Sequence, residues 1–320
     1  MDTPTELGAF LRSRRARLRP EDVGLVAYGT RRRVPGLRRE ELAQLAGVSV
    51  AYYTRLEQGQ SRNASDGVLD AIAGALRLTP DEHAHLRNLA RPACARRQPD
   101  PRPESARRST RHLLAAMDAV PALVLDQRFD VLAWNRLGHA LFAGHLAADS
   151  PDHPATRPNT QRLLFLDPHT RELYPDWDGE ARRAVSALRL AAGELPQDRR
   201  LAELIGELTI NSDAFAALWS RHPVRKCAFG VKSFHHPLVG AMELSFEMTR
   251  LPESAGHGLL MFSAEPGSPS EGALRLLSTA SAGPAPRTAA EPAPETHPAP
   301  APAAAAPVRT PRAPQKRTAS

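Results

Sequence analysis

The stretch from Leu37 to Gly59, LRREELAQLAGVSVAYYTRLEQG, decides the fold of the front of this chain. It reads as two short helices whose apolar residues recur at helical spacing, namely Leu42, Leu45, Ala46, Tyr53 and Leu56. Gly47 can adopt the left-handed conformation that ends a helix, and Ser49 is a good N-cap for the next one. Two short helices joined by a glycine-containing turn of three or four residues predict a helix-turn-helix.

Amphipathic segments surround this pair on both sides. Residues 5–18 place Leu7, Phe10 and Leu11 on one helical face, with arginines at other positions. Further helices are expected over 65–76 and 81–89, the second of them directly after a proline. Residues 1–90 are therefore expected to form an all-α domain of five helices.

Charge is distributed unevenly along the chain. The formal net charge over 320 residues is +7, but residues 1–111 carry +8, residues 112–264 carry −3 and residues 265–320 carry +2. Nucleic-acid binding by the front would produce such an asymmetry. The length suggests about two domains, and a hydrophobic content of 42% allows each of them a core.

Composition separates a linker and a tail from these domains. Residues 91–111 hold prolines among arginine and aspartate, which predicts an interdomain linker. Residues 267–320 are expected to be a mostly disordered Ala/Pro-rich tail, because large apolar residues are almost absent after Gly283. Two cysteines exclude a disulfide scaffold. An acidic N-terminus and the lack of a bilayer-spanning apolar run predict a cytoplasmic protein with no membrane partner.

Residues 112–266 predict an α+β domain. Two β-prone runs at 121–126 and 129–135 predict a hairpin. Segments with helical patterns follow as far as Ser220, and β-prone runs return at 228–234, 241–248 and 259–262. Met242, Leu244 and Phe246 alternate with polar residues, as in a half-buried antiparallel strand. We expect an antiparallel sheet with helices on one face.

The helix-turn-helix segment resembles the Xre-type family of Cro and lambda repressor, through AQLAGVS at 43–49 and RLEQG at 55–59. The resemblance implies that the second helix enters the major groove of double-stranded DNA, and that a homodimer supplies the specificity one helix lacks. Tyr53 is expected in the core, and Glu57 is expected to tie the helix end to neighbouring backbone. The candidate DNA contacts are Arg31, Arg32, Arg33, Arg38, Arg39, Ser49, Val50, Ala51, Tyr52, Thr54 and Arg55.

The middle domain resembles PAS-like sensor domains in its order of elements. More narrowly, VLAWN at 131–135, LFLDP at 164–168, LYPDW at 173–177, FHHPLVG at 234–240 and AEPGS at 264–268 resemble the ligand-binding domain of MmyB-like transcription regulators. This resemblance implies a small effector, for which an acyl-like molecule is one candidate. The candidate pocket residues are Trp134, Asn135, Phe165, Trp177, Trp219, Arg225, His235 and Phe246, with Arg225, Lys226 or His235 as anchors for an acidic head group.

The leading hypothesis is a sequence-specific DNA-binding transcription regulator that is modulated by a small ligand and is not an enzyme. Two alternatives stay open: an enzyme with a regulatory helix-turn-helix, and an antitoxin or nucleoid-type DNA-binding protein. Cys227 with His222 or His235 could form a nucleophile and base, but nothing locates a third group. The sequence contains neither a glycine-rich phosphate loop nor an HExxH motif, so we expect no cofactor and no metal site.

Overall fold

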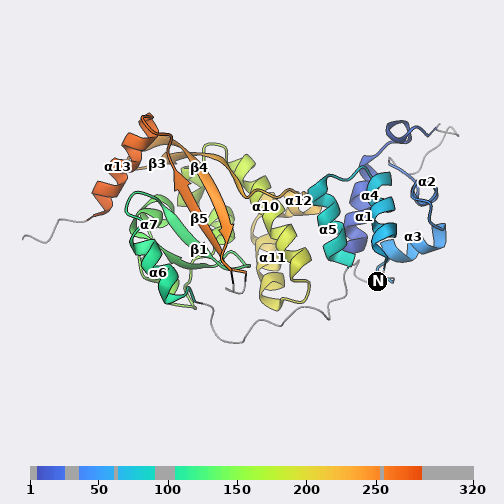
Figure 1. Cartoon of the computed structure of the whole chain (residues 1–320), viewed down its shortest axis with the longest axis horizontal. Helices are drawn as coiled ribbons and strands as arrows, with labels where there is room; N and C mark the ends of the chain where they lie inside the picture. Colours follow the sequence, from blue (N-terminus) through green and yellow to red (C-terminus); the bar gives the residue numbers. More distant parts are fainter. Residues whose placement is uncertain (1–5, 26–35, 61–63, 91–104, 253–255, 283–320) are drawn as a thin grey trace, which may run out of the picture. The chain divides into compact units, whose positions relative to one another are not determined.

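The computed structural model describes residues 6–25, 36–60, 64–90, 105–252 and 256–282 (Figure 1). Its first five helices are α1 (Glu6–Arg17), α2 (Arg39–Leu45), α3 (Val50–Glu57), α4 (Asp66–Ala75) and α5 (Pro80–Ala90), with a short 3-10 helix at Pro20–Val23. Their apolar faces meet in one core whose fully buried members include Phe10, Leu11, Leu42, Tyr53, Leu56, Ile72 and Leu86. The predicted all-α front is confirmed.

The turn between α2 and α3 has the geometry that the sequence predicts. Gly47 adopts a φ of +65°, and the amide of Val48 donates to the carbonyl of Ala43 at 3.0 Å. Ser49 caps α3, because its hydroxyl oxygen accepts a hydrogen bond from the amide of Tyr52 at 3.1 Å. The turn therefore gives a partner to one carbonyl near the end of α2 and to one amide in the first turn of α3.

One residue of the predicted core lies elsewhere. Leu45 is 37% exposed, although the apolar pattern predicts it to be buried. The helix α2 has only seven residues, and Leu42 and Ala46, four residues apart, already form its buried stripe. Leu45 is therefore left at the edge of the core.

After residue 105 the chain forms one antiparallel sheet of five strands, which are β1 (Ala122–Leu125), β2 (Val131–Trp134), β3 (Phe229–His236), β4 (Gly240–Arg250) and β5 (Gly258–Ser263). The strand order is β2-β1-β5-β4-β3, so the first strand pairs with the last (Figure 1). The strands β3 and β4 form a hairpin in which Phe234 lies opposite Met242. The predicted α+β class and the antiparallel sheet are confirmed.

Eight α-helices and a short 3-10 helix at Ser150–Asp152 accompany this sheet in the described residues. The α-helices are α6 (Arg108–Ala115), α7 (Arg136–Ala143), α8 (Thr160–Leu166), α9 (Pro168–Leu173), α10 (Trp177–Glu194), α11 (Arg199–Asn211), α12 (Asp213–Ser220) and α13 (Pro269–Ser281). The helices α8, α10, α11 and α12 share an apolar core of their own. Within the described residues, none of the helices combines the length and the apolar character needed to cross a membrane.

Helices cover both faces of the sheet, not one as predicted. The helices α7, α9 and α13 pack against one face, and α6 packs against the other through Leu114. The reason lies in β1, where Leu123 and Leu125 point to one face and Val124 to the other. A strand with two apolar faces needs cover on both sides.

The helix α13 lies inside the segment 267–320 that the sequence predicts to be a tail. Ser268 caps it by accepting a hydrogen bond from the amide of Glu271 at 3.2 Å, and Leu274 and Leu277 are buried against the sheet. The predicted start of the tail at residue 267 is therefore wrong. The short apolar stripe of α13 was overlooked because the Ala/Pro-rich sequence that follows it dominates the composition of this segment. Similarly, α6 begins at Arg108, within the predicted linker 91–111. Residues 91–104 and 283–320 lie outside the described residues.

We expect Leu277→Ala to lower the free energy of unfolding by about 3 kcal/mol, because truncating a fully buried leucine leaves a cavity. Leu276→Ala is the matched control, since this neighbouring side chain is 65% exposed. The control should change the free energy by less than about 0.5 kcal/mol. Chemical denaturation measures both values, and equal losses would contradict the packing of α13 on the sheet.

Candidate functional site

The outward face of α3 carries five of the side chains predicted to contact DNA. Val50, Ala51 and Arg55 are exposed, and Tyr52 and Thr54 are partly exposed. The core residues of the helix point the opposite way. Small side chains at the start of the helix allow its backbone to approach base edges, while the longer ones can reach polar groups in the groove.

Two further predicted contacts flank this face. Ser49 is exposed, and its hydroxyl hydrogen stays available to a phosphate while its oxygen caps α3. Arg38 is exposed at the start of α2, and its backbone amide donates to the carboxylate of Glu41 at 2.7 Å. Arg31, Arg32 and Arg33 lie outside the described residues.

Arg39, whose side chain is 41% exposed, pairs with the fully buried carboxylate of Glu57. Its Nε and Nη2 donate to Oε1 of Glu57 at 3.1 and 3.0 Å, and Arg15 of α1 donates to both oxygens of the same carboxylate at 3.1 and 3.0 Å. Burial raises the pKa of Glu57, but the hydrogen bonds and charges of the two arginines outweigh it and hold the pKa below its usual range. Glu57 thus joins its helix to arginine side chains rather than to the backbone groups expected from the sequence.

An apolar cavity of about 150 Å³ lies between the sheet and the helices α7, α8 and α10. Its lining includes Leu125, Val131, Trp134, Phe142, Tyr174, Phe246 and Phe262. Trp134 and Phe246 are the two predicted pocket residues that line it. Pockets for drug-sized ligands usually measure at least about 300 Å³, so this cavity suits a small or slender molecule.

Three charged side chains interrupt the apolar lining. Glu180 of α10 is buried and pairs with Lys232 of β3 at 2.5 Å and with Arg183 on its own helix. The ammonium of Lys232 also lies 5.1 Å from the centre of the Phe246 ring. Two cations facing one carboxylate leave a net positive charge that favours an anionic head group. No sequence pattern connects α10 with β3, so sequence reasoning missed these residues.

Three other predicted pocket residues form hydrogen bonds within the fold or pack in a core. The side-chain oxygen of Asn135 accepts hydrogen bonds from the amides of Ala122 and Gly138 at 3.0 and 2.7 Å, which joins β1 to the start of α7. Phe165 and Trp177 pack edge to face, with ring centres 5.7 Å apart, in the core of the helical layer. None of the three lines the apolar cavity.

The remaining three predicted pocket residues also lie away from the apolar cavity. Trp219 stacks on Phe215 at the edge of the helical core. Arg225 lines a separate cavity of about 440 Å³, and His235 lines another of about 710 Å³. Lys226 donates its backbone amide to Asp81 at 2.9 Å.

Two family models match the sequence of this chain. A helix-turn-helix domain model matches residues 6–86. A model of the MmyB-like transcription regulator ligand binding domain matches residues 106–277, which is more than half of the chain. The chain belongs to the MmyB-like transcription regulators. The combination of a helix-turn-helix domain with this ligand-binding domain fits a DNA-binding transcription regulator. No curated protein matches the chain.

In this MmyB-like regulator, α10 contacts the helix-turn-helix part within one compact unit that holds all described residues. Arg189 is only 1% exposed, and it binds Glu6 of α1 at 2.8 Å and the carbonyl of Trp219 at 2.5 Å. Its guanidinium carbon lies 3.5 Å from the centre of the Trp219 ring. One turn further, Gly193 passes so close to His85 of α5 that a β-carbon would lie 2.7 Å from the imidazole.

Arg14 of α1 adds a second polar contact to this junction. It donates to the carbonyl of His222 at 2.6 Å and pairs with Glu82 at 2.9 Å. Burial, followed by the charges of Arg189 and Arg14, lowers the pKa of both His85 and His222 to about 3. Both imidazoles are therefore neutral at pH 7, and the positive charge stays on the arginines.

One group of side chains among the described residues has the composition of a metal site. It consists of His145, Asp167 and His169, beside the cavity of about 710 Å³ that His235 also lines. No metal site was expected here, because the sequence lacks an HExxH motif. His145 is far along the chain from Asp167 and His169, so no short motif connects the three.

We expect the free energy of unfolding to fall between pH 7 and pH 5, with His85 contributing part of the loss. A histidine whose pKa is about 3 in the fold, against 6.5 unfolded, stabilises the fold above pH 6.5, and this contribution is lost as the pH falls toward 3. By pH 5 the loss from His85 should reach about 2 kcal/mol. Chemical denaturation at the two pH values measures it.

Two substitutions on α5 identify the titrating group. His85→Leu removes the buried base and should reduce the dependence of stability on pH. His83→Leu changes a partly exposed histidine of the same helix and should leave that dependence in place. Wild-type dependence in both variants would show that another group is responsible.

Proposed function

We propose that this protein is a sequence-specific transcription regulator whose affinity for DNA changes when a small apolar ligand binds the MmyB-like domain. The helix-turn-helix match and the +8 charge of residues 1–111 support DNA binding. The apolar cavity supports the ligand. The cations Lys232 and Arg183 at its wall favour a short acyl chain with an anionic head group.

The helix α10 carries this proposal, because it reaches both halves of the molecule. Glu180 and Arg183, in its first half, line the cavity, whereas Arg189 and Gly193, in its second half, contact α1 and α5. Helix shifts of about 1–2 Å are a common form of regulatory transition. A ligand that fits the cavity in only one position of α10 would favour that position and so bias the contacts at the other end.

We further propose that α3 reads the DNA and that two copies bind one site. The contacts would come from Arg38, Ser49, Val50, Ala51, Tyr52, Thr54 and Arg55. Arg39 already donates to Glu57, which makes Arg38 the better candidate for a phosphate contact. One recognition helix reads few base pairs, so a homodimer on a two-fold site would supply the missing specificity.

We expect Arg38→Ala to weaken binding to every DNA sequence about equally and Tyr52→Ala to change the preferred site. Phosphate contacts carry no sequence information, whereas base contacts do. The measurement is binding to an operator selected from random DNA and to a mutated operator, at several salt concentrations. Arg38→Ala should reduce the salt slope by about 1.

Arg199→Ala provides the control, because this exposed arginine pairs with Glu203 in the MmyB-like domain. It should change neither affinity nor preference. Operator binding that is insensitive to salt would contradict DNA recognition through phosphates. The same losses at both sites for Tyr52→Ala and Arg38→Ala would contradict base reading by Tyr52.

We expect Gly193→Ala to uncouple ligand binding from DNA binding. The added methyl group forces α5 away from α10, while the cavity lies at the other half of the helix. With octanoate as the probe, the wild-type affinity for the operator should change on ligand addition, and that of Gly193→Ala should not. Fluorescence anisotropy of labelled operator measures DNA binding, and calorimetry checks that both proteins bind octanoate equally.

Gly206→Ala is the matched control for this substitution. Gly206 lies on α11, and its β-carbon would meet open space. This variant should respond to octanoate as the wild type does. A wild-type protein that binds octanoate with no change in operator affinity would contradict ligand modulation, while leaving the proposal of DNA binding intact.

A further inference from the structure

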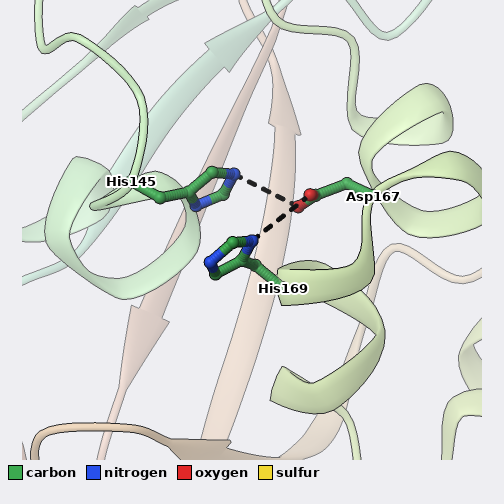
Figure 2. A group of neighbouring side chains, drawn as sticks. All are labelled: His145, Asp167 and His169. Carbon is green, nitrogen blue, oxygen red and sulfur yellow. Dashed lines mark ion pairs between the residues drawn. The ribbon is translucent and has the colours of Figure 1, made fainter.

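Three side chains from separate segments point toward one another (Figure 2). Two of them, His145 and His169, line the cavity of about 710 Å³. His145 lies in the turn after α7, Asp167 lies between α8 and α9, and His169 lies in the first turn of α9. Nε2 of His145 is 3.2 Å from Oδ2 of Asp167, and Nδ1 of His169 is 3.7 Å from Oδ1. All three candidate ligand atoms lie within 4.8 Å of one another.

Four of the five histidines that line this cavity fall into two kinds. A ring nitrogen of His139 forms a hydrogen bond with a backbone carbonyl oxygen at 2.8 Å, and one of His236 does so at 3.0 Å. Both side chains therefore have structural partners. In the described part of the chain, the ring nitrogens of His145 and His169 have Asp167 as their polar partner. Their nitrogens are therefore available for another ligand, and the carboxylate holds them together.

The spacing fits a small divalent ion. Zinc binds imidazole nitrogen at about 2.0–2.1 Å and carboxylate oxygen at about 2.0–2.2 Å, so neighbouring ligands in a tetrahedral shell lie about 3.4 Å apart. The distances of 3.2 and 3.7 Å bracket this value. The imidazoles stack with centres 4.5 Å apart, and both turn a nitrogen toward the carboxylate (Figure 2). The His169 side chain is 69% exposed, so it is free to rotate into the shell.

A neighbouring residue orients the carboxylate. Thr170 donates its backbone amide and its hydroxyl to Oδ2 of Asp167, at 3.0 and 2.7 Å. These bonds set the direction of Oδ1, the oxygen that faces His169. Hydrogen bonds of this kind to metal-binding carboxylates orient the ligand and raise affinity for the ion.

We propose that His145, Asp167 and His169 bind a divalent transition-metal ion of the zinc class. Two imidazoles and one carboxylate favour such an ion over magnesium and calcium, which prefer oxygen ligands. Three protein ligands leave one position open, and the adjoining cavity gives water or a small anion access to it. The ion would tie the end of α7 to the start of α9. This site does not depend on the proposed effector cavity.

The test is titration of the chelator-treated full-length protein with Zn²⁺, followed by calorimetry, and with Co²⁺, followed by visible absorption. We expect one tight site per chain and a Co²⁺ spectrum typical of nitrogen and oxygen ligands. His169→Ala should weaken Zn²⁺ binding by at least about tenfold. Because this side chain is exposed, the variant should keep the wild-type circular dichroism, and His145→Ala provides a second, independent loss.

His153→Ala is the matched control, since His153 pairs with Asp149 at 3.3 Å and has no second imidazole beside it. It should bind Zn²⁺ as the wild type does. Three results would overturn the proposal: equal Zn²⁺ affinity in the wild type and both site variants, an equal loss in the control, or binding of Mg²⁺ as tight as that of Zn²⁺.

Discussion

A single buried negative charge, on Glu57, sets the position of α3, the helix that we propose reads DNA. Arg15 reaches it from α1 and Arg39 from α2, so one carboxylate joins three helices. Removing one partner from a buried ion pair costs about 3–5 kcal/mol, because the other charge is left without a counter-ion. The outward face of α3 is therefore held in place in the protein alone, so the proposed binding of DNA would require little loss of conformational freedom.

The helix-turn-helix was predictable because its signals are local. Gly47 and Ser49 act on their own neighbours through φ and through an N-cap, and the apolar stripe of each helix is visible within two turns. The long alternating strand β4 was predictable for the same reason. Leu45 shows where the pattern is too coarse, because a seven-residue helix has room for one buried stripe and the pattern cannot say which leucine lies outside it.

The cavity and the metal-type cluster were not predictable, because packing between distant segments creates them. Glu180 and Lys232 meet only when α10 lies over β3, and His145 meets Asp167 only when α7 and α9 share a face of the sheet. Aromatic residues were a poor guide to the pocket, because the sequence does not distinguish a tryptophan of the core from one that lines a cavity. Trp177 packs in the helical core, whereas Trp134 lines the apolar cavity. The partners Arg15 and Arg39 of Glu57 were missed for the same reason.

The junction between α10 and the helix-turn-helix part is built around a permanent charge. Arg189 is the largest fully buried side chain among the described residues, and its partners are a carboxylate and a carbonyl oxygen. Leu190 and Val224 add apolar contacts with the helix-turn-helix core, but the polar groups of the junction can form hydrogen bonds with water if they are exposed. A junction made of leucines would instead expose an aggregation-prone apolar surface when it opened. If the proposed shift of α10 opened this junction, its polar groups would keep the exposed surface hydrated and the same contacts could form again.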